Sequence, residues 1–163
     1  VPLLEVAVVD REGRVLPPGQ MGEIAVRRNG EWFFVKDRGR MDEEGYFYHG
    51  GRSDDVIISA GWTLSATEIE NTLMKHPAVL EAAVIGVPDP VRGQVVKAFV
   101  VARGCGEDTV SDIQSFMKEQ LGRHEYPRQV EFVTELPKTP AGKINRKALR
   151  ELAAAANSPR ENT

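Results

Sequence analysis

Short alternations of apolar and polar residues dominate the first part of the chain. Residues 4–9 and 22–28 follow the period of two that is typical of β-strands. The dipeptide Asn29-Gly30 favours a tight hairpin turn, and a second turn is expected at residues 42–45, between two aromatic runs. We therefore predict that residues 1–50 form an all-β segment, with fewer strands than an independent sheet needs.

A polar, glycine-rich stretch at residues 51–55 interrupts this alternation and is predicted to be a linker. Beyond it, strand and helix periodicities alternate, and the polar residues 157–163 are expected to be a disordered tail. The pattern predicts an α+β domain over residues 56–156, in which helices flank a short β-sheet. The expected elements, besides one helix discussed next, are strands at 56–58, 79–87, 95–102 and 129–133 and helices at 111–121 and 148–156.

The first helix of this domain has clear start and stop signals. Ser65 is a candidate N-cap with Glu68 three residues later, and Pro77 ends the helix. Leu64, Ile69 and Leu73 are expected to form its apolar face. Gly61 is expected to lie in a turn between the preceding strand and this helix.

Composition narrows the class of protein. The chain has 163 residues, a net charge of −3, 41% hydrophobic residues and 28% charged residues, which is ordinary for a globular protein and provides no basic field for nucleic acid. No apolar run reaches the roughly 20 residues of a membrane span, and no secretory signal opens the chain. Because the chain starts at Val1 inside a strand pattern, we expect a fragment of a longer protein.

The cysteine and histidine content gives little chemistry. Cys105 is the single cysteine, so it forms no internal disulfide, and its glycine neighbours indicate a loop. A lone cysteine fits a reducing compartment, and we expect cytoplasmic localisation. The histidines His49, His76 and His124 have neither the spacing of metal ligands nor a nucleophile partner, so no metal site is predicted.

Residues 136–146 are the most informative stretch of the sequence. They combine two prolines and a glycine with Lys143, which directly follows the glycine. No acidic residue lies between Leu136 and Arg150. Such a loop can deliver an ammonium group to a developing anion. On charge alone, a solvated basic turn before a C-terminal helix is the simpler interpretation.

The order of motifs along the whole chain favours a functional role for this loop over a solvated basic turn. Asp37 is followed by the Gly-Arg-Ser-Asp-Asp run at 51–55, by Gly61, by the Glu-Ile-Glu run at 68–70 and by the lysine loop. As an ordered set, they resemble the C-terminal end of AMP-forming acyl-CoA synthetases. That superfamily also holds luciferases and the adenylation domains of peptide synthetases. The resemblance covers nearly the whole chain.

The resemblance implies a domain organisation and a reaction. Residues 1–50 would end a large N-terminal domain, residues 51–55 would be a hinge, and residues 56–156 would form a mobile lid domain. The complete enzyme would join a carboxylic acid to AMP, using ATP with Mg²⁺, and then transfer the acyl group to coenzyme A. The acid pocket and the phosphate-binding loop belong to the missing N-terminal domain, so the fragment is expected to be inactive alone.

Three residues would act on the nucleotide in that reaction. By resemblance, Lys143 is the catalytic lysine, which stabilises charge at the α-phosphate. Asp37 would hold the ribose of ATP, although Val35-Lys36-Asp37 stands where the family commonly has Thr-Gly-Asp. Arg52 would contact the nucleotide. The alternatives are an exposed turn lysine, a surface aspartate, and a linker arginine paired with a neighbouring aspartate.

Four further residues would serve domain rotation and coenzyme A. Asp54 matches the pivot of the hinge, about which the domain rotates once the adenylate has formed. Gly61 would line the pantetheine tunnel, where a side chain would block the thiol. Trp62 and Arg92 are further candidates for binding coenzyme A. The alternatives are a solvated aspartate pair, an ordinary turn glycine, a packed tryptophan and a surface charge.

Two other functions stay open at this point. The chain could belong to an adenylation domain that loads a carrier protein, although Arg92-Gly93-Gln94 resembles coenzyme A ligases. It could instead be a binding module without catalysis, but a scaffold would need none of the matched residues. The 50–62 segment resembles medium-chain and aryl acid ligases more than acetyl-specific ones, and the acid itself is not readable from this sequence.

Overall fold

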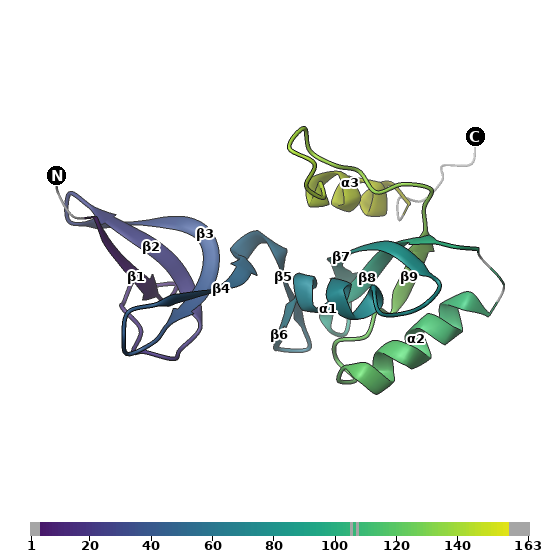
Figure 1. Ribbon diagram of the computed structural model, residues 1–163, viewed down its shortest axis with the longest axis horizontal. Helices are drawn as coiled ribbons and strands as arrows, with labels where there is room; N and C mark the ends of the chain where they lie inside the picture. The colour runs from purple at the N-terminus through teal and green to yellow at the C-terminus, as the bar shows by residue number, and fades with distance from the viewer. Residues whose placement is uncertain (1–3, 105, 107, 157–163) are drawn as a thin grey trace. The chain divides into compact units, whose positions relative to one another are not determined.

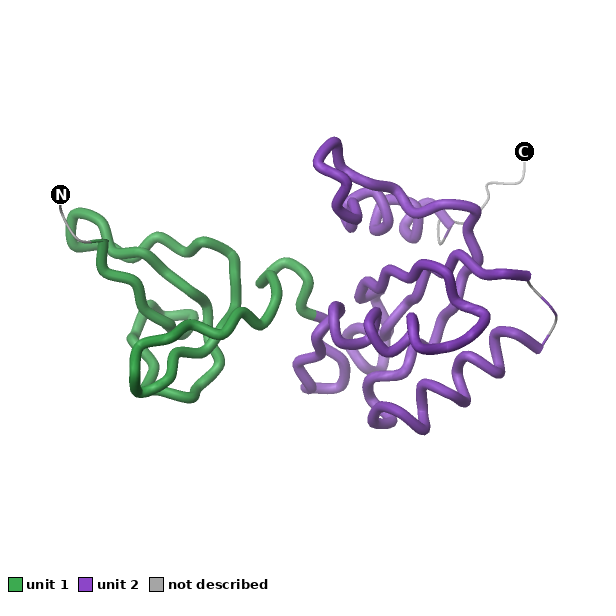
Figure 2. Tube along the Cα trace, in the orientation of Figure 1, with its two compact units in different colours: residues 1–56 green, residues 57–163 purple. Residues whose placement is uncertain are grey.

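A computed structural model describes residues 4–104, 106 and 108–156. The chain divides into two compact units, Val1–Val56 and Ile57–Thr163, which are coloured separately in Figure 2. The loop expected at Cys105 and the tail expected at residues 157–163 lie outside the described residues. Each unit has its own sheet and core.

The first unit is a four-stranded antiparallel sheet in the order β1-β2-β3-β4 (Figure 1). Its strands are β1 (Glu5–Val9), β2 (Gly22–Arg28), β3 (Glu31–Met41) and β4 (Phe47–Arg52). The predicted hairpin at Asn29-Gly30 is confirmed, because these residues have positive φ angles of 53° and 87° and connect β2 to β3. The all-β character predicted for this segment is also confirmed.

Strand β4 extends further than the sequence pattern indicated. It runs to Arg52, so the polar stretch predicted as a linker begins inside the sheet. A single 3-10 turn, η1 (Ser53–Asp55), then leads out of the unit. Arg52 is therefore held by cross-strand pairing rather than by a free loop.

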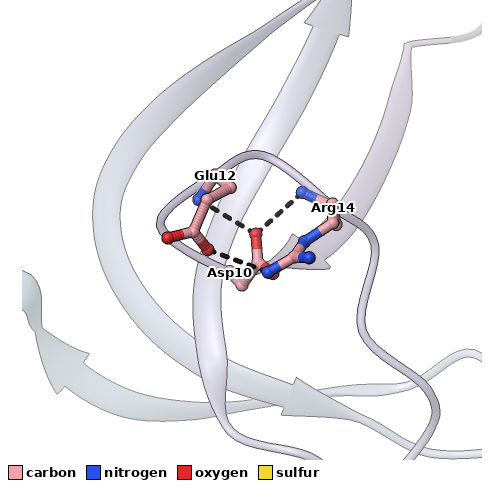
Figure 3. Close-up of polar contacts among 3 residues, drawn as sticks. All are labelled: Asp10, Glu12 and Arg14. Atoms are coloured by element: carbon pink, nitrogen blue, oxygen red, sulfur yellow. Dashed lines mark hydrogen bonds and ion pairs between the residues drawn. The ribbon is translucent and has the colours of Figure 1, made fainter.

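A carboxylate organises the loop between β1 and β2 (Figure 3). Asp10 Oδ1 accepts hydrogen bonds from the backbone N–H groups of Glu12 at 3.0 Å and Arg14 at 2.9 Å. The Arg14 guanidinium donates to Asp10 Oδ2 at 2.7 Å. The backbone N–H of Arg14, first of all, lowers the pKa of Asp10 below its ordinary value of 3.8.

The second unit begins with a small hairpin and continues as a mixed sheet with three helices. Its elements are β5 (Val56–Ser59), β6 (Trp62–Ser65), α1 (Ala66–Leu73), β7 (Val79–Asp89), β8 (Gly93–Ala102), α2 (Thr109–Gln120), β9 (Gln129–Phe132) and α3 (Arg146–Ala156). Strand β7 pairs antiparallel with β8, and β8 pairs parallel with β9. The predicted α+β class is confirmed. None of the helices in the described ranges has the length and apolar character needed to cross a membrane.

Both faces of the β7-β8-β9 sheet are covered. Alternate residues of β7 and β8, such as Val84 and Ala98, pack with α1 and α2. Their neighbours, such as Ile85 and Phe99, pack with α3 on the opposite face. Figure 1 shows α3 and α2 on opposite sides of this sheet. A strand pair buried on both faces explains the nearly continuous apolar runs in the sequence.

Helix α1 starts at the signal that the sequence contains but ends at Leu73, four residues before Pro77. Ser65 accepts a hydrogen bond from the Glu68 N–H at 3.4 Å, which confirms the predicted N-cap. Beyond the helix, His76 is buried, and its Nδ1 accepts from the Ala78 N–H at 3.2 Å. Its Nε2 lies 3.1 Å from Asp112 of α2, so this histidine joins the turn after α1 to α2.

Two leucines of α3 offer a matched test of the second core. Leu149 is 0% exposed and Leu152 is 54% exposed. Leu149→Ala should lower the free energy of unfolding by about 2–5 kcal/mol, because it leaves a cavity against the sheet. Leu152→Ala should change it by no more than about 0.5 kcal/mol. Urea denaturation followed by circular dichroism measures both, and equal effects would contradict the assignment of α3 to this core.

The Asp10 loop predicts an acid-sensitive contribution to the stability of the first unit. A carboxyl whose pKa is lowered by folding stabilises the folded state above its unfolded pKa, and this contribution is lost as pH falls through the folded value. Below about pH 4 the wild type should therefore lose more stability than Asp10→Asn. Each unit contains one tryptophan, so urea denaturation in a Trp62→Phe background reports on Trp32 of the first unit. Parallel pH profiles for both variants would contradict the prediction.

Candidate functional site

Lys143 lies in a short, well-braced hairpin ahead of α3. Lys138 and Ile144 form an isolated antiparallel bridge, and the Thr139 N–H donates to the Lys143 carbonyl at 2.7 Å. Gly142 makes the turn with a φ of 78°. The Asn145 N–H closes the base of the hairpin on the Pro137 carbonyl at 2.8 Å. We call residues 136–145 the lysine hairpin.

The lysine hairpin is fixed to the domain by apolar and charged contacts. Leu136 is 5% exposed and Ile144 packs against the same cluster as α3. Lys138 Nζ lies 3.0 Å from Glu81 of β7. The hairpin thus presents an exposed Lys143 on a backbone that cannot easily move.

A buried ion pair lies directly after the lysine hairpin. One terminal nitrogen of Arg146 lies 2.7 Å and 2.8 Å from the two carboxylate oxygens of Glu70 in α1. The two side chains are only 15% and 11% exposed. Glu70 was predicted only as part of the Glu-Ile-Glu run, and no partner was expected for it, because residues 76 positions apart give no local signal of contact.

The predicted nucleotide-binding residues and the predicted pivot form one charged cluster in the first unit. Asp37 and Arg52 are cross-strand partners, and their Oδ1 and guanidinium nitrogen lie 3.7 Å apart. Arg52 also lies 3.7 Å from Asp54, as its alternative interpretation anticipated, and His49 lies 3.6 Å from Asp37. Asp54 lies 3.9 Å from Lys36 as well. Asp37 is about one-third exposed, so its carboxylate is open to a ligand.

Lys36 has an unusual backbone conformation next to Asp37. Its φ is 62°, in the left-handed region where an L-residue is strained. The β2–β3 register shifts here, between the pairs Glu23↔Arg38 and Ala25↔Phe34, so β3 bulges. The family commonly has glycine at this position. The left-handed turn is therefore present in this chain despite the lysine.

Gly61 lies in a turn between two strands. Ala60 and Gly61 have positive φ angles of 49° and 82° and connect β5 to β6. The expectation of a strand-to-helix turn was wrong, because residues 62–65 form a further strand. Leu64 is buried but belongs to β6 rather than to the helix.

The structure brings the predicted coenzyme A residues of this unit together. The Ala60 N–H donates to the Arg92 carbonyl at 2.9 Å, so the Gly61 turn contacts the β7–β8 loop. Asp89 Oδ1 accepts from the Arg92 N–H at 2.8 Å and shapes that loop. A Cβ added at Gly61 would meet no heavy atom of the described residues within 4 Å. The backbone here is thus open to close approach by a ligand.

An exposed aromatic pair extends this surface. Trp62 is 58% exposed and stacks on His124, with ring centroids 5.1 Å apart and planes at 16°. The tryptophan is therefore not packed in the core. Two residues on, the Tyr126 ring lies 4.6 Å from Lys118 Nζ and 5.1 Å from the Arg128 guanidinium. No chemistry was predicted for His124, and Tyr126 was not among the predicted site residues, although Arg128 two positions after it was a usable signal.

The lysine hairpin and the Gly61 turn are attached to opposite faces of the sheet. Leu136 and Ile144 pack in the cluster beneath α3. The strands beside Gly61 contribute Ile57 and Leu64 to the cluster beneath α1 and α2. Lys97 of β8 is buried, and its Nζ lies 2.7 Å from the Glu131 carboxylate of β9. In the described parts of the chain, no group of three or more metal-ligating side chains gathers.

Comparison with known proteins shows which family and which enzymes the chain is similar to. Residues 68–143 match the family model of the AMP-binding enzyme C-terminal domain. The chain is 41% identical to human acyl-coenzyme A synthetase ACSM5, mitochondrial, over 91% of its own length and 31% of that relative. It resembles the crystal structure of ATP-bound MatB from Rhodopseudomonas palustris with a TM-score of 0.83 and 30% identity, over 97% of this chain and 35% of that one.

A third relative belongs to the same structural class. The amide bond synthetase McbA from Marinactinospora thermotolerans matches 93% of this chain and 35% of its own, with a TM-score of 0.75 and 33% identity. Residues 68–143 therefore belong to the AMP-binding enzyme C-terminal domain family. Over more than nine-tenths of its length, the chain is similar to a part of an acyl-coenzyme A synthetase and of the other two relatives. It spans about a third of the length of the relatives that it matches.

Lys36 provides a test of the strained turn beside Asp37. Lys36→Gly and Lys36→Ala both remove the ion pair with Asp54, but only glycine relieves the positive φ. Lys36→Gly should therefore be more stable than Lys36→Ala by about 1 kcal/mol. Arg38 of the same strand is the control, since its backbone is not left-handed and alanine should be the more stable there. Urea denaturation followed by Trp32 fluorescence measures the stability of the four variants. If glycine were more stable than alanine at both positions, or at neither, the assignment of backbone strain to Lys36 would be contradicted.

Proposed function

We propose that this chain is the C-terminal part of an ATP-dependent, AMP-forming carboxylic acid–CoA ligase. The complete enzyme first joins the acid to the α-phosphate of ATP and releases pyrophosphate. It then transfers the acyl group from AMP to the thiol of coenzyme A. The braced presentation of Lys143 is the observation that carries the proposal, because a solvated turn would need no such bracing.

Lys143 stabilises the first half-reaction. Negative charge accumulates around the phosphorus as the carboxylate attacks and pyrophosphate leaves. An ammonium fixed in advance stabilises this charge without reorganising during the reaction. The two prolines, the positive φ of Gly142 and the closing hydrogen bond of Asn145 supply that fixed position.

Asp37 and Arg52 hold the nucleotide in this proposal. A carboxylate accepts two hydrogen bonds from a ribose diol, and a guanidinium donates to hydroxyl or phosphate oxygens. The cross-strand register supports it, because it places both groups side by side with the aspartate partly open. The ATP-bound structure of a relative is consistent with this substrate. Mg²⁺ enters with ATP.

The Gly61 turn, Trp62 and Arg92 serve the second half-reaction. The bare backbone at Gly61 admits the pantetheine arm. The Trp62–His124 stack offers a flat surface to the adenine of coenzyme A, and the cations around Tyr126 offer charge to its phosphates. Because this turn and the lysine hairpin belong to opposite faces, the domain rotates between half-reactions, and Asp54 is its pivot.

The proposal also covers the acyl acceptor and the carboxylic acid substrate. Coenzyme A is favoured because relatives at about 40% identity are named acyl-coenzyme A synthetases and because the aromatic and basic groups suit its nucleotide. An amide bond synthetase has the same fold, so an amine or a carrier-bound thiol is the alternative acceptor. The acid pocket lies in the N-terminal domain of such enzymes, so these residues alone do not complete a turnover. Cytoplasmic localisation stays a prediction.

Separate assays of the two half-reactions test this function in the complete polypeptide that carries the chain. Lys143→Ala should lower ATP–pyrophosphate exchange by about 10²–10³-fold, since it removes one stabilising charge. Thioester formation from supplied acyl-adenylate should be retained. Trp62→Ala is the reciprocal variant: it should weaken thioester formation and leave exchange unchanged. If Lys143→Ala leaves exchange intact across a panel of acids, the proposed role of the lysine hairpin is wrong.

A further inference from the structure

The buried pair of Glu70 and Arg146 joins three elements at one carboxylate. Glu70 projects from α1, and both of its oxygens bind Arg146, the first residue of α3. The same Glu70 Oε1 also accepts a hydrogen bond from the Val84 N–H of β7 at 2.9 Å. A carboxylate placed in this way acts as a fixed point for both helices and for the strand.

The Glu70 carboxylate lies beside the edge strand of the sheet. Strand β7 is at the edge of the β7-β8-β9 sheet, and the Val84 N–H points away from β8 toward Glu70. Helix α1 covers one face of the sheet, and α3 covers the other. The Glu70–Arg146 pair therefore connects the two layers around the open edge of the sheet.

Arg146 is also the first helical residue after the lysine hairpin. The hairpin closes at Asn145, whose side chain accepts from the Ala148 N–H at 3.1 Å and caps α3. Holding Arg146 therefore fixes the chain three residues beyond Lys143. The other charged anchor of the hairpin, Lys138 with Glu81, is half exposed at both side chains and contributes less.

We propose that Glu70, through Arg146, is a positioning residue for Lys143 in the adenylation half-reaction. It does not touch the substrate; it sets where the lysine ammonium stands relative to the α-phosphate. A displacement of about 1 Å at a reacting centre can cost 10²-fold in rate. This inference rests on the proposed function, because it needs Lys143 to act in adenylation.

Three variants of the complete polypeptide test the proposal. Glu70→Gln keeps the shape of the side chain and removes its charge. Arg146→Lys keeps the charge but removes the guanidinium that contacts both Glu70 oxygens, and it decides the question if Glu70→Gln does not fold. Each should lower kcat of ATP–pyrophosphate exchange by roughly 10–100-fold, with little change in KM for ATP. The control Lys138→Met removes the exposed anchor and should change kcat by less than about threefold.

A double-mutant cycle separates positioning from general stability. If Glu70 acts through Lys143, Glu70→Gln should cost nothing further in a Lys143→Ala background. Thioester formation from supplied acyl-adenylate should stay near wild type in every variant that thermal denaturation shows to be folded. Equal losses in both half-reactions, additive losses in the cycle, or unchanged exchange in a folded variant would each overturn the proposal. Intact exchange in Lys143→Ala alone would instead refute the proposed function.

Discussion

The burial of both faces of the β7–β8 strand pair is the constraint on which the second unit depends. Apolar side chains alternate to the two sides, so each face requires its own cover. Helices α1 and α2 cover one face, and α3 with the base of the lysine hairpin covers the other. Chemistry attached to these covers is therefore divided between two sides of a thin domain. In the proposed function, the domain therefore turns between the two half-reactions.

The first unit holds several charged side chains close together at the end of its sheet. Cross-strand pairing places Asp37 opposite Arg52, and the bulged, left-handed backbone at Lys36 adds a third charge facing Asp54. Strand pairing fixes the first two residues at little entropic cost. The residue proposed as pivot, Asp54, thus contacts Arg52, one of the two residues proposed to hold the nucleotide.

Much of this architecture follows from the sequence, and the failures have local causes. The apolar runs of β7 and β8 and the capping residue Ser65 are strong local signals. Strand β6 was not predicted, because alanine rarely adopts a positive φ and the dipeptide Ala60-Gly61 therefore did not indicate a hairpin turn. Leu64 was then assigned to the helix. The Glu70–Arg146 pair and the Trp62–His124 stack depend on tertiary folding, which no local pattern encodes.

The family match ends at residue 143, three residues before Arg146. Helix α3 lies beyond that limit, yet it supplies Leu149 to one core cluster and a guanidinium to the carboxylate at the edge of β7. A domain cut at the end of the match would therefore expose to water the part of the sheet face on which α3 packs. Any shortened or transplanted form of this domain therefore needs its C-terminal boundary after α3.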